Sequence, residues 1–214
     1  MRSADTRGSV ERVTAQYLHA PMLSRYLRFP RLRDLLDTQQ GIPLLDMMQP
    51  LEAPDTHVVS AAIGWLGLGN VAEAKAELAG ISPSQRNHPD VLEVQWLICA
   101  EQSKWDEALR IARALMASAP DRSSGWLHQA YALRRVPDGG VKQAWHALLP
   151  AFDKFPKEAV ISYNLSCYAC QMKQLEAARV WFKRASFLGG KEKFKRMALE
   201  DPDLEPLWEE IRGT

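Results

Sequence analysis

The sequence predicts an all-α fold, a solenoid in which helical hairpins stack one after another. Four alanines recur at spacings of 34, 36 and 34 residues, namely Ala74, Ala108, Ala144 and Ala178. The residues four and seven positions after each alanine are all apolar, which places them on one face of a helix. A period of about 34 residues is typical of helical hairpins stacked in a row. Because closely crossing helices need a small residue at their contact, each alanine predicts the crossing point of one hairpin.

The composition is that of a soluble globular protein. The chain has 214 residues, of which 46% are hydrophobic and 25% are charged. A net charge of +1 gives no overall reason to expect nucleic acid or a membrane surface as a partner. The sequence lacks an apolar run of about 18 residues, so membrane insertion is not expected. Its N-terminus lacks the apolar core of a secretory signal, and we therefore expect a cytoplasmic protein.

A basic N-terminal extension, residues 1–54, precedes the repeat. Residues 1–33 contain seven arginines against two acidic residues, a net charge of +5. We expect short helices at about 10–29 and 31–39, and disorder in the polar residues before them.

Three interpretations of this extension are open. It could be an arm that binds anionic lipid or RNA. It could instead fold back as an internal ligand. It could also be absent from the native product, because Met47 and Met48 lie just before the first repeat.

The repeat divides residues 55–192 into four units, which are 55–88, 89–122, 123–158 and 159–192. The first helices of these units are predicted at 56–68, 90–102, 122–135 and 157–172. The second helices are predicted at 71–80, 104–117, 139–154 and 175–188.

The turns between these helices carry recognisable capping residues. Asn70 followed by Glu73 three positions later is typical of a helix N-terminus, and Ser103 with Asp106 predicts the same arrangement. The third unit is longer because its turn, residues 136–140, contains extra proline and glycine positions.

The C-terminal residues 193–214 predict a cap for the last unit. Helices are expected at 191–199 and 203–212. A stack of repeats needs such a cap, since its last unit would otherwise expose an apolar face. The residues expected to cover that face are Leu204, Leu207, Trp208 and Ile211.

These positions resemble the tetratricopeptide repeat family across residues 55–192. The fourth unit carries the family pattern through Leu165, Ser166, Ala178, Phe182 and Ala185. The third carries it through Trp126, Ala130, Ala144, Ala151 and Pro156. Trp96 and Arg86 depart from the pattern, standing where a small residue and a proline are usual. The tail is similar to the closing segment of small bacterial tetratricopeptide proteins of unassigned function.

The resemblance implies a right-handed superhelix whose first helices line a concave groove. The unit positions expected to point into it are Val59, Ile63, Leu66, Glu93, Leu97, Leu127, Tyr131, Arg134, Arg135, Tyr163, Cys167 and Cys170. An apolar floor with two tyrosines suits an amphipathic helix or an extended apolar peptide. The alternative is that some of these residues only pack between neighbouring helices.

Family members that bind the C-termini of chaperones hold the terminal carboxylate with a lysine and asparagine clamp. The matching positions here carry Val59 and Ile63, then Glu93 and Leu97. We therefore do not expect a carboxylate-clamp domain.

Cys167 and Cys170 form a Cys-x-x-Cys pair in the middle of a predicted helix. Zinc needs four ligands, and no second pair with suitable spacing exists. Reactive pairs usually lie at a helix N-terminus, where the thiol pKa is lowered. We therefore expect these cysteines to be packing residues, with a redox or metal role as the alternative.

The sequence contains no recognisable catalytic set or phosphate-binding loop, so a non-enzymatic protein without metal or cofactor is expected. The resemblance implies a protein–protein interaction scaffold that binds a peptide or helix of a partner. Self-assembly is a further alternative.

Overall fold

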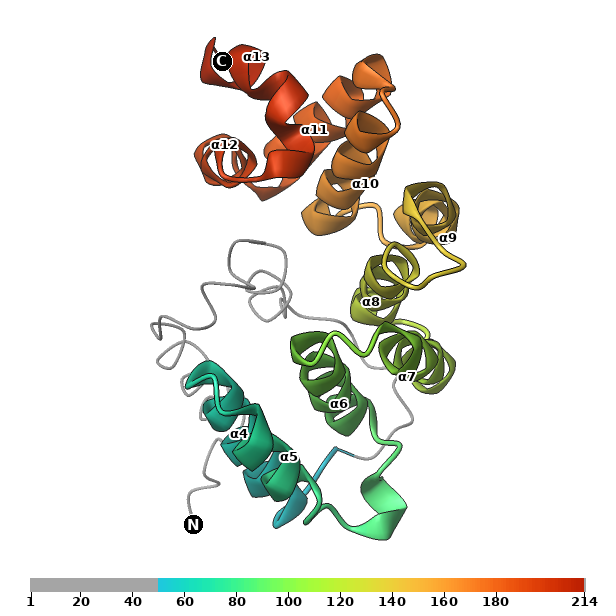
Figure 1. The fold of residues 1–214 in the computed structure, drawn as a ribbon, viewed down its shortest axis with the longest axis vertical. Helices are drawn as coiled ribbons and strands as arrows, with labels where there is room; N and C mark the ends of the chain where they lie inside the picture. Colours follow the sequence, from blue (N-terminus) through green and yellow to red (C-terminus); the bar gives the residue numbers. More distant parts are fainter. Residues whose placement is uncertain (1–49, 214) are drawn as a thin grey trace, which may run out of the picture.

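The computed structural model describes residues 50–213 (Figure 1). Within this range the chain is entirely helical, with ten α-helices and two short 3-10 helices. None of these helices has the length and apolar character needed to cross a bilayer. The expectations for the N-terminal extension up to residue 49 lie outside the described residues.

Eight α-helices form four successive pairs. The first two pairs are α4 (Asp55–Gly67) with α5 (Val71–Leu78), and α6 (Pro89–Glu101) with α7 (Trp105–Ser118). A 3-10 helix, η1 (Pro83–Gln85), lies between them. The other pairs are α8 (Ser123–Leu133) with α9 (Val141–Lys154), and α10 (Ala159–Gln171) with α11 (Leu175–Gly189). These bounds confirm the eight predicted helices to within two residues.

The C-terminal end is formed by α12 (Lys191–Leu199), η2 (Pro202–Leu207) and α13 (Trp208–Gly213). The single helix predicted at 203–212 was wrong, because its first half is a 3-10 helix. Pro206 lies inside η2 and has no N–H for an α-helical hydrogen bond, and its ring would clash with the carbonyl one turn earlier.

Successive helices pack against one another, and α4 also contacts α6. The pairs follow one another along the long axis, from α4 and α5 at one end to α12 and α13 at the other (Figure 1). All four repeat alanines are fully buried at 0% exposure. The core is consequently a chain of apolar clusters between neighbouring pairs.

The turns inside three of the pairs share one backbone geometry. Gly69, Ser103 and Lys173 adopt left-handed conformations with φ of 74°, 55° and 62°. In each turn the following N–H reaches back to a carbonyl five residues earlier at 2.9 Å, as in Lys104 N to Cys99 O. This pattern satisfies carbonyls at the end of the first helix.

The predicted N-cap at Asn70 is confirmed, since its Oδ1 accepts from Glu73 N at 3.2 Å. The one predicted at Ser103 was wrong. Ser103 is the left-handed turn residue, and Lys104 precedes the helix without a side-chain cap.

Replacement of Ala108 by leucine should destabilise the fold. Ala108 is fully buried, so the larger side chain must force two packed helices apart. We expect Ala108→Leu to lower the free energy of unfolding by about 1–3 kcal/mol in urea titrations. Ala114→Leu is the matched control, because Ala114 lies on the same helix and is exposed. Equal effects of the two substitutions would contradict the crossing role of Ala108.

Candidate binding surface

The predicted groove residues differ widely in exposure. The buried members of the set are Val59, Leu66, Leu127, Tyr131, Tyr163, Cys167 and Cys170. The partly exposed members are Ile63, Glu93, Leu97, Arg134 and Arg135. The buried members therefore include every predicted residue on α10, whereas α6 retains two partly exposed ones.

The C-terminal segment covers the predicted inner residues of α10. Helix η2 packs against α10. The Tyr163 side chain is fully buried, its ring lies 5.4 Å from that of Phe194, and its hydroxyl donates to Asp201 Oδ2 at 3.0 Å. Gln171 Nε2 donates to the Asp203 carbonyl oxygen at 3.3 Å. This part of the predicted groove is thus filled by the chain's own cap.

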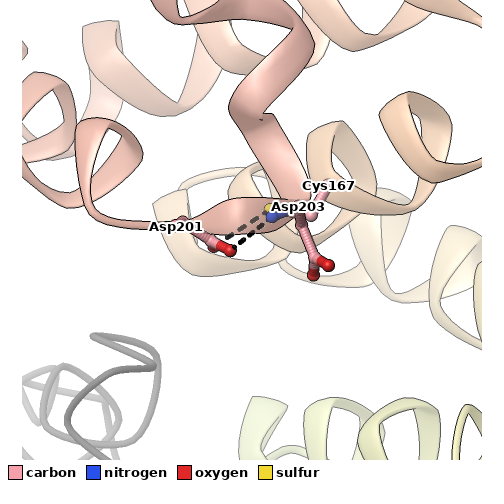
Figure 2. Close-up of side chains that lie close together, drawn as sticks. All are labelled: Cys167, Asp201 and Asp203. Carbon is pink, nitrogen blue, oxygen red and sulfur yellow. Dashed lines mark hydrogen bonds between the residues drawn. The ribbon is translucent and has the colours of Figure 1, made fainter.

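Cys167, Asp201 and Asp203 lie together at this contact (Figure 2). The Cys167 thiol donates to Asp201 Oδ2 at 3.5 Å. The Asp203 N–H donates to Asp201 Oδ1 at 3.0 Å, which caps the start of η2. One ligand atom from each residue lies within 4.8 Å of the others, a separation that would suit a metal ion.

Arg134, from the end of α8, already supplies a positive charge at this cluster. Its guanidinium makes a two-pronged ion pair with Asp203, with Nη2 at 2.7 Å from Oδ1 and Nη1 against Oδ2. All four oxygens of the two aspartates therefore accept a hydrogen bond. A metal ion would have to displace the guanidinium. The arrangement is therefore better explained as a structural contact that holds η2 against α8 and α10, here called the latch, than as a metal site.

Burial governs the chemistry of the thiols. Burial, together with the negative charges of Asp203 and Asp201, raises the pKa of Cys170 to about 11. Burial likewise raises the pKa of Cys99 to about 11. Because the thiolate is the reactive form, neither thiol is activated near neutral pH.

A second polar network joins α6 to α8. Glu93 accepts hydrogen bonds from Ser124 Oγ and from His128, whose Nε2 lies 2.5 Å from Glu93 Oε2. The Trp96 ring stacks on His128 with centroids 3.8 Å apart and an interplanar angle of 7°. Trp96, which departs from the family pattern, is thereby accommodated in the core.

The charge of Glu93 is stabilised although its side chain is largely removed from water, with 24% exposure. Burial is the largest single influence, and on its own it would raise the Glu93 pKa. The electrostatic interaction and hydrogen bond with His128, the hydrogen bond of Ser124 and the charge of Arg122 together outweigh burial, so the Glu93 pKa is lowered from 4.5. Ser124 donates to the carboxylate and not to the imidazole, so this set lacks the nucleophile–base order of hydrolases.

A shallow pocket of about 460 Å³ lies where the α6–α7 turn meets the α8–α9 turn. Its walls include Trp105, Arg135 and Pro137. The Arg135 guanidinium lies 3.5 Å from the centroid of the Tyr131 ring and 5.1 Å from that of Trp105. Trp105 was not among the predicted groove residues, although an aromatic residue in the polar run Lys104–Glu107 is a detectable signal.

Comparisons with protein-family models, with curated proteins and with solved structures found no match to this chain. The resemblance to tetratricopeptide repeats therefore stays a prediction.

Glu93→Gln should change how stability depends on pH. A lowered pKa means that ionised Glu93 contributes stability above its ordinary value of 4.5, and that this contribution is lost as the pH falls through the lower folded-state value. We expect the variant to be less stable by about 1–3 kcal/mol at pH 7 and the difference to shrink below pH 4.5. Urea titrations across pH measure this, with exposed Glu107→Gln as control. A stability difference between Glu93→Gln and the wild type that stays constant with pH would contradict the lowered pKa of Glu93.

Arg134→Met should destabilise the C-terminal cap. It leaves the buried carboxylate of Asp203 without its cation, a loss that typically costs about 3–5 kcal/mol. Adding Asp203→Leu should restore part of this stability, because the remaining uncompensated charge is removed. Thermal and urea unfolding of the single and double variants measure both effects. A single variant as stable as the wild type would disprove the latch.

Proposed function

We propose that this chain is a non-enzymatic protein-interaction scaffold, a right-handed α-solenoid of four tetratricopeptide-like hairpins closed by a C-terminal cap. The recurrence of one turn geometry at Gly69, Ser103 and Lys173 supports the repeat, since these positions are separated by 34 and 70 residues. Helices packed in sequence order also support it. Such a stack would present a preorganised surface, so little conformational entropy would be lost on binding.

The partner peptide binds over α4 and α6 and at the Trp105–Arg135 pocket. The observation that carries this assignment is the uneven filling of the inner surface. The cap buries Tyr163, whereas Ile63 and Leu97 stay partly exposed. Leu97 and Trp105 both pack against the apolar cluster between α6, α7 and α8, so the same core supports α6 and the pocket.

The chemistry of this surface favours a peptide with apolar side chains and a carboxylate or aromatic group. Arg135 lines the pocket, where its guanidinium lies over the Tyr131 ring and donates to the Tyr131 carbonyl oxygen, and a guanidinium is a group that favours an anion or a π system. Glu101, one turn beyond Leu97, has its pKa raised to about 7 by burial, so its charge changes near neutral pH. The raised Cys170 pKa weakens the thiol-dependent alternative. A cytoplasmic location remains part of the proposal.

Selection of random peptides against the full chain tests the binding surface. We expect enriched peptides to bind Arg135→Glu about thirtyfold more weakly than wild type, since a central arginine anchor is worth about 2 kcal/mol. Arg113→Glu, an equal charge change at an exposed site on α7, should bind like wild type.

Circular dichroism of each variant separates lost binding from lost folding. Arg135→Lys keeps the charge but lacks the planar group, and it should bind with intermediate affinity. Failure to enrich any peptide, or peptides that bind all three variants equally, would disprove the assignment.

A further inference from the structure

Helix α11 carries two large apolar side chains that no part of residues 50–213 covers. Val180 is 67% exposed and Phe187 is 87% exposed. They are seven residues apart, two helical turns, and therefore lie on one face about 10 Å apart along the axis. Lys183 lies between them and is also exposed. Single exposed apolar residues are ordinary on protein surfaces. The charges around Val180 and Phe187 therefore decide whether these two residues indicate a docking surface.

The segment that contains Phe187 is strongly basic. Residues 183–196 hold six basic residues against one acidic residue, in a chain whose net charge is only +1. This segment comprises the end of α11, a turn at Gly190 and the start of α12, so its charges are concentrated at one joint between two helices.

Three of these cations lack an acidic partner among the described residues. Lys183, Lys191 and Arg196 are exposed and make no ion pair within residues 50–213. Arg179, one turn before Lys183, differs, because it pairs with Glu176 and Glu210 at 2.5 Å each. The positive potential at the end of α11 is thus available to an external anion.

The shape of this surface discriminates between possible partners. Phe187 protrudes from a helix, and the pocket beside Trp105 lies on other elements. A peptide usually gains affinity by filling a groove, and single-stranded nucleic acid needs several stacking platforms along a basic channel. A bilayer interface needs neither feature, since it accepts a protruding aromatic side chain while lysines and arginines contact its head groups.

We propose that the α11–α12 surface docks on an anionic phospholipid bilayer. Phe187 enters the interface, Val180 lies against it, and Lys183, Lys191 and Arg196 bind the lipid phosphates and carboxylates. The contact is peripheral and leaves the helices folded. It goes beyond the proposed peptide-binding function and uses a different helix pair, so the two proposals can fail independently.

Co-sedimentation of the full chain with vesicles tests the proposal. We expect binding to vesicles of phosphatidylcholine with phosphatidylserine and none to phosphatidylcholine alone. Binding should weaken as salt rises from roughly 0.1 M to 0.5 M, because the Debye length shortens. Phe187→Ser should reduce the affinity about tenfold, since an apolar side chain no longer enters the interface.

Charge reversal provides a second, independent variant. Lys183→Glu with Lys191→Glu should reduce the affinity at least about thirtyfold, since each charge near an anionic surface contributes appreciably. Lys75→Glu with Lys142→Glu is the matched control, because it changes the net charge equally at exposed sites elsewhere and should retain most binding. All substituted residues are exposed, so circular dichroism should show unchanged helicity.

Binding that is equal with and without phosphatidylserine would overturn the proposal. Equal affinities of Phe187→Ser, the charge reversal and the wild type would also overturn it, because vesicle binding would then come from the arginines of residues 1–33. Retention of oligodeoxythymidylate or polyglutamate without vesicle binding would overturn it in favour of nucleic acid or an acidic protein segment.

Discussion

Close helix crossing at one buried alanine per pair is the constraint on which the rest of the structure depends. In three of the four pairs, a left-handed turn residue precedes the alanine by five positions, as Lys173 precedes Ala178. The turn therefore fixes which residue of the second helix meets the first. A left-handed conformation costs a residue with a side chain roughly 1–2 kcal/mol, yet Ser103 and Lys173 adopt it. The packing of the helices therefore holds Ser103 and Lys173 in the left-handed conformation, although neither is a glycine.

Polar contacts then join helices that are not neighbours along the chain. The Glu93–His128 contact joins α6 to α8, and the Arg134–Asp203 ion pair joins α8 to η2. Desolvation offsets much of the stability that such buried pairs provide, so their main effect is on which arrangement forms. If Asp203 met a residue other than Arg134, its carboxylate would be buried without the cation that stabilises it. The first contact fixes how the second pair is placed relative to the third, and the second contact fixes the third pair relative to the C-terminal cap.

Local features of the sequence were sufficient to predict the helices. Helix bounds follow from periodicity and turn residues, which act over a few positions, and the Asn70 cap needs only Glu73. Coverage of Tyr163 by the cap could not be predicted, because it depends on contacts such as the one between Arg134 and Asp203, 69 residues apart. The 3-10 start of the cap depends on Pro206, whose effect the apolar pattern conceals. Whether an inner residue is exposed is decided by what packs over it, and one sequence contains no direct signal for that.

The membrane-docking surface lies on α11 and α12 near one end of the molecule, whereas the peptide surface extends from α4 and α6 at the other end to the pocket beside Trp105 (Figure 1). Occupation of one would therefore not block the other. A scaffold held on a bilayer by α11 would confine its bound peptide to the layer beside that membrane. Such confinement raises the effective concentration of the partner near any target bound to the same membrane, without any new contact between this chain and that target. This advantage requires a stiff connection between the surfaces, and the buried polar contacts along α6, α8 and η2 stiffen the intervening helix pairs.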